Sequence, residues 1–523
     1  MQGLKDEAAG RRPGNVLLVT FDQWRADCIS ALGHPCVRTP TVDSLAADGV
    51  LFRNHFTQAA PCGPARASLF TGLYLHNHRS LRNGTPLDDR HPNLAREARK
   101  AGYAPKLFGY TDTSADPRLH DPADPVLATY EGVMPGFDAE LLLTESLEPW
   151  GAWLKARGRE VPEKLTDLYL PDRARDVAGR GPTYAPMRMP VEEEITFFVA
   201  DRVREWLAVN GASPWFLHVS FIRPHPPYVA PAPFNSMVDP ADVPPSRRAP
   251  TREDQGRQHP WLAAHIERQW RGNLPLAETV PMASLDEAAL RQWRATYYGL
   301  VSLADAALGR IVDALKSSGL YDDTLIVLTA DHGEHLGDHW MHGKDGYHDQ
   351  AFHIPLVVRD PRAAGDAGRG RVVDAFTEAV DVMPTVLGWL GRPVPPTCDG
   401  RSLAPFLAGG EPARWRDAAH WGFDFRDVRG GYFETRLGLA PDECSLLVRR
   451  ERTRKYVHFA GLPPLLFDLE ADPGELVDLS GDPARHADMA DCARRLLSWR
   501  MAHEDRTLSH LHLGAGGAAT NLP

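Results

Sequence analysis

The sequence is poor in cysteine, and its few cysteines are scattered. Six cysteines occur in 523 residues, and none has the C-x-x-C spacing of a zinc or redox site. A disulfide framework is therefore not expected, and a reducing, cytoplasmic location is the default expectation. The chain also has no apolar run near the roughly 18 residues that span a bilayer. Because residues 1–14 are polar and lack the apolar segment of a signal peptide, we expect no membrane contact.

Dense positive charge, internal repeats and disulfide-rich segments are missing too. The formal net charge is −11 at pH 7, and no basic run is dense enough for nucleic acid, so nucleic acid is excluded as a partner. The hydrophobic content of 43% and the charged content of 24% are those of a soluble globular protein. At 523 residues the chain is long for one ordinary domain.

Short apolar runs alternate with stretches of helical periodicity over most of the chain. Such runs are typical of strands that are buried on both faces of a parallel sheet. The clearest runs are residues 15–21, 215–221, 324–329 and 354–358. Residues 192–209 and 285–318 carry apolar residues at helical spacing, the second as one long helix or a broken pair. We therefore predict an α/β fold with a large, mostly parallel central sheet flanked by helices.

The character of the chain changes near residue 399. Residues 445–448 and 455–459 are typical of antiparallel strands, and residues 484–503 of a closing helix. Residues 114–190 are rich in Pro, Asp and Gly with little periodicity, which predicts long surface loops. The predicted parts are a catalytic α/β domain at 1–395, a smaller C-terminal α+β part with an antiparallel sheet at 396–507, and an extended tail at 508–523.

The string Pro61-Cys62-Gly63-Pro64-Ala65-Arg66 is an unusual start for a helix. Gly63 and Pro64 favour a turn, and proline is tolerated in the first turn of a helix. Cys62 is thereby expected at a helix N-terminus, where the macrodipole favours an anion, with Arg66 one turn further on. Most free cysteines are small buried side chains, and from these residues alone that alternative stays open for Cys62.

Polar residues follow four predicted strands. They are Asp22 and Gln23, then Tyr110 to Thr113, then His225 between prolines, and finally Asp331 and His332 with Lys344 shortly after. Because strand ends at one edge of a sheet converge, these side chains can form one site with Cys62. The plainer alternatives are that Asp22 caps a helix and that His225 is an ordinary surface histidine.

The candidate site offers mostly oxygen ligands. Asp22, Gln23 and Asp331 carry hard oxygen donors and His332 one nitrogen, a set that suits Mn²⁺, Mg²⁺ or Ca²⁺. The histidine-rich segment 332–348 could hold zinc instead, but no second Cys/His cluster completes a tetrahedron.

The order of these motifs resembles that of the alkaline phosphatase superfamily, in its formylglycine-dependent sulfatase branch, and is most similar to phosphonate monoester hydrolases. Sulfatases usually carry Asp-Asp at the first site and Asp-Asn at the last, whereas Asp22-Gln23 and Asp331-His332 stand here. That difference favours the phosphonate-type relatives. The similar stretches are residues 19–27, 61–74, 223–227, 328–338, 343–344, 455–459 and 499–500, spread over nearly the whole chain.

The resemblance implies a role for each residue of the candidate site. Cys62 would be oxidised to formylglycine by a maturation enzyme, and the hydrated aldehyde would be the nucleophile. Arg66 and Lys344 would orient the diol and neutralise the substrate anion, His225 would protonate the leaving oxygen, and Tyr110 would contact the substrate. One divalent metal ion, Mn²⁺ in preference to Ca²⁺ or Mg²⁺, would be held by Asp22, Gln23, Cys62, Asp331 and His332.

One position departs from the family pattern. The family has Thr two residues after the tyrosine, and this chain has Asp112. An aspartate puts an anion near a site for anions. Either Thr113 takes over the substrate contact, or the preferred substrate differs.

By this resemblance the chain is expected to be a metal-dependent hydrolase of phosphonate monoesters and phosphodiesters that also accepts sulfate esters. A sulfatase with the same nucleophile and metal is the alternative, because singly charged phosphorus diesters and sulfate monoesters are similar in shape and charge. A non-catalytic anion-binding relative is disfavoured, because every element of the site is present. The expected partners are a small anionic ester and the maturation enzyme, and the family tendency predicts a homotetramer with C-terminal arms.

Overall fold

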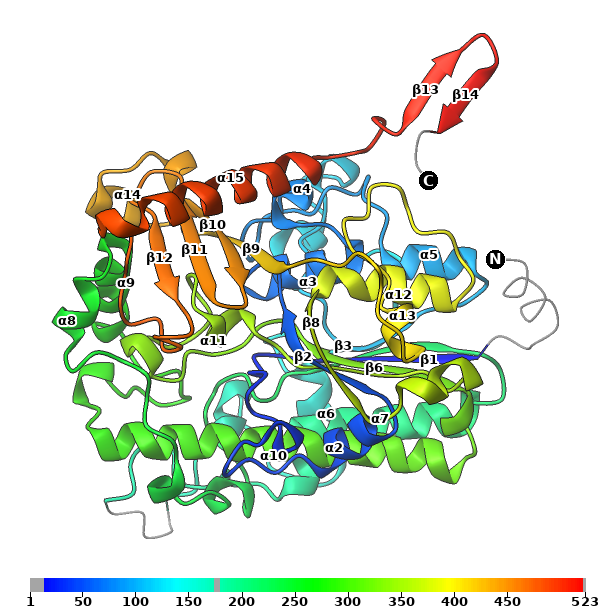
Figure 1. Cartoon of the computed structure of the whole chain (residues 1–523). Helices are drawn as coiled ribbons and strands as arrows, with labels where there is room; N and C mark the ends of the chain where they lie inside the picture. The colour runs from blue at the N-terminus through cyan, green and yellow to red at the C-terminus, as the bar shows by residue number, and fades with distance from the viewer. Residues whose placement is uncertain (1–13, 174–178, 521–523) are drawn as a thin grey trace.

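The computed structural model describes residues 14–173 and 179–520. Its centre is a sheet of eight strands in the order β4-β3-β5-β1-β6-β7-β2-β8 (Figure 1). Among the described strands of this sheet only β7 runs antiparallel to its neighbours, so the prediction of a large, mostly parallel sheet is confirmed. The strands are β1 (Asn15–Phe21), β2 (Val50–Phe56), β3 (Lys106–Gly109), β4 (Asp138–Leu142), β5 (Phe216–Phe221), β6 (Thr324–Ala330), β7 (Leu356–Arg359) and β8 (Arg371–Glu378).

The central strands β1, β5 and β6 are buried along their whole length. Their continuous apolar sequences fit this position, because helices cover both faces of the sheet. Phe21 at the end of β1 pairs with Phe221 of β5 and with Ala330 of β6. The three strands therefore end level with one another, and the residues that follow them emerge at one edge.

Helices lie on both sides of the central sheet (Figure 1). One side carries α2 (Pro40–Ala47), α6 (Glu148–Ala156), α7 (Ile195–Asn210) and α10 (Glu287–Ser317), and the other α3 (Cys62–Thr71), α5 (Leu94–Lys100), α12 (Val382–Trp389) and α13 (Ala404–Leu407). The segment predicted at 285–318 is one helix of 31 residues, α10. The other α-helices are α4 (Leu75–His78), α8 (Arg252–Gly256), α9 (Pro260–Trp270), α11 (Asp349–Phe352), α14 (Tyr432–Leu437) and α15 (His486–Ala502). No described helix combines the length and the apolar character that crossing a membrane requires.

The C-terminal part contains a separate antiparallel sheet in the order β12-β11-β10-β9. Its strands are β9 (Ala418–Asp424), β10 (Ser445–Glu451), β11 (Arg454–Phe459) and β12 (Leu465–Asp468). The predicted antiparallel sheet and the closing helix α15, which lies along this sheet (Figure 1), are confirmed. Trp421 of β9 stacks on Phe56 and on Phe352, so the two sheets share one hydrophobic core. The boundaries at 395/396 and 507/508 stay predictions.

The prediction of long loops at 114–190 is wrong in part, because β4 and α6 lie there. β4 is an edge strand whose residues Asp138, Ala139 and Glu140 are exposed, so its sequence has no apolar pattern to detect. Residues 174–178 of this stretch, and the polar N-terminus at 1–13, lie outside the described residues.

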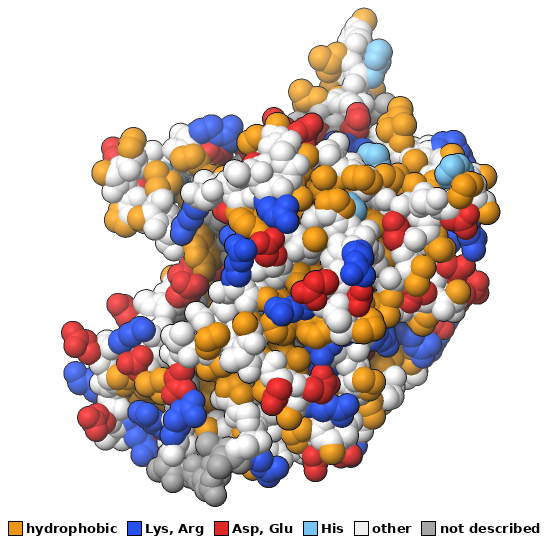
Figure 2. All heavy atoms as spheres, turned by 90° about the vertical axis from the view of Figure 1, so that its left-hand side faces the viewer, with side chains coloured by type: hydrophobic (Ala, Val, Ile, Leu, Met, Phe, Trp, Pro, Cys, Tyr) orange, Lys and Arg blue, Asp and Glu red, His pale blue; other side chains and the backbone are white. Residues whose placement is uncertain are grey.

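The tail folds back on itself as a hairpin of β13 (Leu511–Gly514) and β14 (Gly517–Thr520). The hairpin projects from the body and stands out at the top of the molecule (Figures 1 and 2). Leu508, Leu511 and Leu513 are 71%, 41% and 77% exposed. A two-stranded hairpin with no further packing is only marginally stable in water.

Candidate active site

The candidate side chains emerge at one edge of the central sheet. They are Asp22 and Gln23 after β1, Tyr110 after β3, His225 after β5, and Asp331 and His332 after β6. These four strands are neighbours in the order β3-β5-β1-β6 and run parallel. The carboxyl ends of such strands are where open α/β sheets bind ligands.

Helix α3 brings Cys62 to this edge. Cys62 is the first residue of the helix and is 4% exposed, so its expected place at a helix N-terminus is confirmed. The next residue packs tightly: the N–H of Gly63 donates to Oδ1 of Asn83 at 2.9 Å. A Cβ atom on Gly63 would lie only 3.0 Å from the carbonyl oxygen of Asp112. The glycine therefore lets the start of α3 approach the loop that carries Tyr110 and Asp112.

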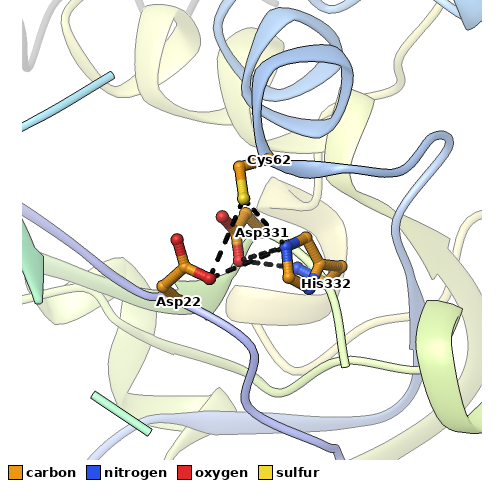
Figure 3. Close-up of side chains that lie close together, drawn as sticks. All are labelled: Asp22, Cys62, Asp331 and His332. Atoms are coloured by element: carbon orange, nitrogen blue, oxygen red, sulfur yellow. Dashed lines mark hydrogen bonds and ion pairs between the residues drawn. The ribbon is translucent and has the colours of Figure 1, made fainter. Parts of the chain in front are cut away.

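Four buried side chains form a group that could hold a metal ion: Asp22, Cys62, Asp331 and His332 (Figure 3). One donor atom from each lies within 4.8 Å of the others. Nε2 of His332 is 3.3 Å from Sγ of Cys62, 3.6 Å from Oδ1 of Asp22 and 3.7 Å from Oδ1 of Asp331. Side chains from three separate chain segments thus point at one small volume.

The donor set fits a divalent cation. Two buried carboxylates at this separation repel one another unless positive charge lies between them. Burial opposes the charge of Asp22, but His225, Lys344, His332 and Arg66 hold its pKa well below the usual range. Oxygen-rich donors with one imidazole suit Mn²⁺, Mg²⁺ or Ca²⁺ better than a closed structural zinc site.

The zinc alternative at 332–348 finds no support in the described residues. His335, His339 and His348 do lie together, with the rings of His339 and His348 stacked at 3.6 Å. However, the group around Cys62 is the one set of clustered metal-ligating side chains among the described residues.

Arg66 is completely buried beneath this group and locks its carboxylates in place. Nη2 of Arg66 lies 3.0 Å from Asp331 and 3.4 Å from Asp22. Nη1 donates to Oγ of Ser220 at 2.7 Å and to the carbonyl oxygen of Tyr110 at 3.1 Å. In the described structure Arg66 therefore orients the candidate metal ligands, and it makes no hydrogen bond to Cys62.

Lys344 is the cation that faces residue 62. Its Nζ lies 3.4 Å from Sγ of Cys62 and 3.1 Å from Oε1 of Gln23. Burial opposes the charge of Lys344, but Cys62, Asp22 and Asp331 raise its pKa above the usual range. Lys344 is therefore a fixed positive charge at the expected position of the substrate anion.

Glu334 is a site residue that sequence analysis missed. It accepts hydrogen bonds from Nε2 of Gln23 and, at 2.8 Å, from the hydroxyl of Tyr228. Because Glu334 holds the amide nitrogen of Gln23, the amide oxygen is left to face Lys344. The signal was present, since Glu334 stands two residues after His332 in the same motif. Gln23 as a metal ligand stays a prediction.

His225 is anchored through one ring nitrogen. Its Nδ1 lies 2.8 Å from the carbonyl oxygen of Pro226, which makes Nδ1 the protonated nitrogen. Burial lowers the pKa of His225 to about 4, against the opposing charge of Asp22. His225 lines the same cavity as Cys62 and Lys344, and Nε2 is the nitrogen left to exchange a proton there.

The side chains of the loop after β3 line two different cavities. The hydroxyl of Tyr110 donates to Oδ2 of Asp22 at 2.7 Å, and Asp112 lines the cavity above Cys62. Thr113 instead lines another cavity, and its hydroxyl donates to Thr111. Asp112 therefore lies at the wall of the cavity above Cys62 and Thr113 does not, and a substrate contact by Thr113 stays a prediction.

A family model described as Sulfatase matches residues 14–392, and one described as the C-terminal part of N-sulphoglucosamine sulphohydrolase matches residues 337–502. The chain is similar to the multifunctional alkaline phosphatase superfamily protein PehA of Trinickia caryophylli. The two are 45% identical over 511 residues, which cover 97% of this chain and 99% of PehA.

Two solved structures are similar along their whole length. A phosphonate monoester hydrolase of Agrobacterium radiobacter superposes with a TM-score of 0.93 at 47% identity, covering 98% of this chain and all of that one. The phosphonate monoester hydrolase SpPMH of Silicibacter pomeroyi superposes with a TM-score of 0.89 at 41% identity, covering 97% of this chain and 99% of that one.

Proposed function

This chain belongs to the sulfatase family, and we propose that it is a metal-dependent hydrolase of phosphonate monoesters and phosphodiesters that also accepts sulfate esters. One observation carries the proposal: Cys62 at the start of α3 lies against Asp22, Asp331, His332 and Lys344 in a single buried group. The preference for phosphorus esters is supported by the phosphonate monoester hydrolases among the similar structures.

Residue 62 and the metal would provide the nucleophile together. Asp22, Asp331, His332 and residue 62, with Gln23 beside them, would hold one divalent ion, Mn²⁺ in preference to Ca²⁺ or Mg²⁺. Such an ion lowers the pKa of a hydroxyl group bound to it. Formylglycine made from Cys62 by a maturation enzyme supplies that hydroxyl as a hydrated aldehyde, which a buried thiol does not.

The fixed cations of the chain would orient the substrate. Lys344 lies beside residue 62 and would bind a non-bridging oxygen of the ester, where its charge is stronger than in water because the site is buried. Arg66 would keep Asp22 and Asp331 at their separation without moving during the reaction. Tyr110 would hold Asp22 through its hydroxyl.

His225 would protonate the leaving oxygen. The Nδ1–H bond to Pro226 fixes the ring so that Nε2 serves the cavity. The negative charge of the bound ester would favour the imidazolium form of His225, and the proton on its Nε2 would pass to the ester oxygen as the bond to phosphorus breaks. This is general acid catalysis by a side chain that the loop after β5 holds rigidly.

The test combines mass spectrometry with turnover. The peptide that contains Cys62 is expected to have lost its sulfur and gained oxygen, and an aryl phosphonate monoester is expected to be hydrolysed faster than an aryl sulfate. Cys62→Ala should lower kcat by about 10⁴-fold or more. Cys492→Ala, which removes another buried free thiol, serves as the matched control. An unmodified thiol in a fully active preparation would refute the nucleophile assignment, and a preference for sulfate would make the enzyme a sulfatase.

The proposal extends to assembly and location. A homotetramer is supported by the projecting hairpin of β13 and β14 with its exposed leucines. A cytoplasmic location is supported by six cysteines that are all free.

A further inference from the structure

The cavity above Cys62 has an acidic wall that the proposed chemistry leaves unused. The wall consists of Asp112, Glu131 and Glu145, with the ring of Tyr130 beside them. Lys344 is the one lysine or arginine in the lining of this cavity, and it lies next to Cys62. Apart from Lys344, the charged side chains in the lining of this cavity are therefore acidic, and burial raises the pKa of Asp112 and of Glu131.

Asp112 is the most unusual member of this wall. It is only 8% exposed and holds its backbone at a φ of 48°, which a non-glycine residue rarely adopts. Its carboxylate accepts no hydrogen bond from any described residue. The nearest cation is Nε of Arg66 at 4.0 Å, and that guanidinium is already bound to Asp331 and Ser220. Burial raises the pKa of Asp112 to about 7, and a cation bound beside it would stabilise the charged carboxylate.

The other members of the wall are held in place by one another. The hydroxyl of Tyr130 donates to Oε1 of Glu145 at 2.5 Å, and the N–H of Glu145 donates to Oε1 of Glu131 at 2.6 Å. These bonds join two loops and use one oxygen of each glutamate. The second oxygens accept no hydrogen bond from the described residues. Glu131 is half-buried and Glu145 is exposed, so the wall offers acceptor oxygens and an aromatic ring that are partly open to solvent.

The cavity also has an apolar part. Leu143, Leu147, Val199 and Ile222 line it, together with the polar residues Asn83, Thr144 and Thr196. An aromatic ring flanked by carboxylates and aliphatic side chains is the chemistry that binds an alkylammonium group, through charge and through the face of the ring. A second anionic group on the substrate would be repelled by the same wall.

We propose that the substrate is a zwitterionic ester whose organic group carries an ammonium or quaternary ammonium cation, bound by Asp112, Glu131 and Tyr130. The inference rests on the proposed function, because the anionic end of the ester must lie at residue 62 and Lys344.

Two phosphodiesters that differ in charge alone test this. Both have 4-nitrophenol as the leaving group. The second alcohol is 2-(trimethylammonio)ethanol in one and its neutral isostere 3,3-dimethylbutanol in the other. The wild-type enzyme is expected to hydrolyse the cationic ester with a kcat/KM about tenfold higher than that of the neutral one. Asp112→Asn and, independently, Glu131→Gln should each bring the ratio of the two values toward one.

Glu160→Gln is the control, because Glu160 is exposed and lies outside the cavity lining; it should leave the ratio unchanged. Because the ratio is measured within each variant, a general loss of activity or of folded protein cancels. A wild-type ratio near one, or a ratio that neither cavity variant lowers, overturns the inference while the proposed function stands. Turnover of neither ester, nor of an aryl phosphonate monoester, overturns the proposed function and this inference with it.

Discussion

The carboxylates of Asp22 and Asp331 are the residues on which the site depends most. Each is almost completely buried, and each faces the guanidinium of Arg66. A buried anion is stable only when paired cations and hydrogen bonds replace its lost hydration. Arg66 supplies part of that compensation, and a divalent metal would supply the rest. The two carboxylates therefore need positive charge beside them, and the same positive charge would also attract an anionic ester.

Glu334 provides the sharpest prediction at this scale. In Glu334→Gln the remaining oxygen can still accept from the backbone N–H groups of Leu336 and Gly343, which Oε1 serves now. The new amide nitrogen, however, would face Nε2 of Gln23, donor against donor. We expect the amide of Gln23 to turn away from Lys344, and both kcat/KM and the affinity for Mn²⁺ to fall about 10- to 100-fold.

The matched control is Tyr228→Phe, which removes the other donor to the same glutamate oxygen. It also removes a hydroxyl to which Nε2 of Gln23 donates at 3.2 Å, but it keeps the bond from Gln23 to Glu334. The decreases in kcat/KM and in the affinity for Mn²⁺ should be much smaller in Tyr228→Phe than in Glu334→Gln. Isothermal titration with Mn²⁺ and steady-state kinetics measure the two quantities. Wild-type values of both in Glu334→Gln would show that Glu334 is structural only.

At the scale of elements, what could be predicted depended on how much of the signal is local. The strands β1, β5 and β6 and the start of α3 were predicted because continuous apolar runs and Gly63-Pro64 determine them. β9 was missed because its sequence includes His420, Gly422 and Asp424, although every residue in it is buried. The strand is held by the core it shares with β2, which no local pattern reveals.

The residues of the candidate site, too, could be predicted only where the signal in the sequence is local. Residues at strand ends could be placed from the sequence, because the parallel sheet determines where they emerge. The choice between Asp112 and Thr113 could not, since it depends on the positive φ of Asp112 and on its packing against Gly63. The role of Glu334 was hidden for a similar reason: its partners Gln23 and Tyr228 are distant in the sequence.

The hairpin of β13 and β14 gives a prediction about assembly. Residues alternate across a strand, so Leu511 and Leu513 share one face and His512 lies on the other. If the hairpin packs on another subunit through its leucines, a chain that ends at residue 507, or the double variant Leu511→Asp and Leu513→Asp, should form smaller species than the full chain. Light scattering after size-exclusion chromatography measures this. His512→Ala should leave the size unchanged, and an unaltered mass for the shortened chain would exclude the hairpin as the assembly element.

The whole molecule buries many histidines whose pKa values are lowered by burial. Burial lowers the pKa of His55, His218 and His339 to about 3, and that of His348 well below its usual value. An unfolded chain binds protons at these positions below pH 6.5, whereas the folded chain does not. Their contribution to stability is therefore complete above pH 6.5 and is lost as the pH falls toward 3. In that range each of these histidines lowers the free energy of unfolding by about 1.4 kcal/mol for every pH unit that the pH falls.

Carboxyl groups whose pKa is raised by burial have the opposite effect, because they stabilise the folded chain as the pH falls, but they are fewer. Burial raises the pKa of Asp305 and of Asp399 to about 6, so these groups take up protons in the folded chain first. Further buried histidines, among them His259, His265, His335 and His420, have pKa values lowered by burial to about 4. The destabilisation by the histidines exceeds the stabilisation by the carboxyl groups. We therefore expect the melting temperature to fall when the pH is lowered from 7.5 to 5.5.

His348 allows the contribution of one buried histidine to the pH dependence of stability to be measured. Its ring is completely buried and stacks on His339, and neither of its nitrogens has a hydrogen-bond partner among the described residues. His348→Phe removes one proton-binding group and keeps an aromatic ring, so the loss of unfolding free energy from pH 7.5 to pH 5.5 should shrink by about 1 kcal/mol. The exposed His486→Gln is the control and should show the wild-type loss. Urea unfolding at both pH values measures it, and the double difference removes any contribution from metal binding. An identical pH dependence in His348→Phe and the wild type would mean that buried histidines do not set the acid stability of this fold.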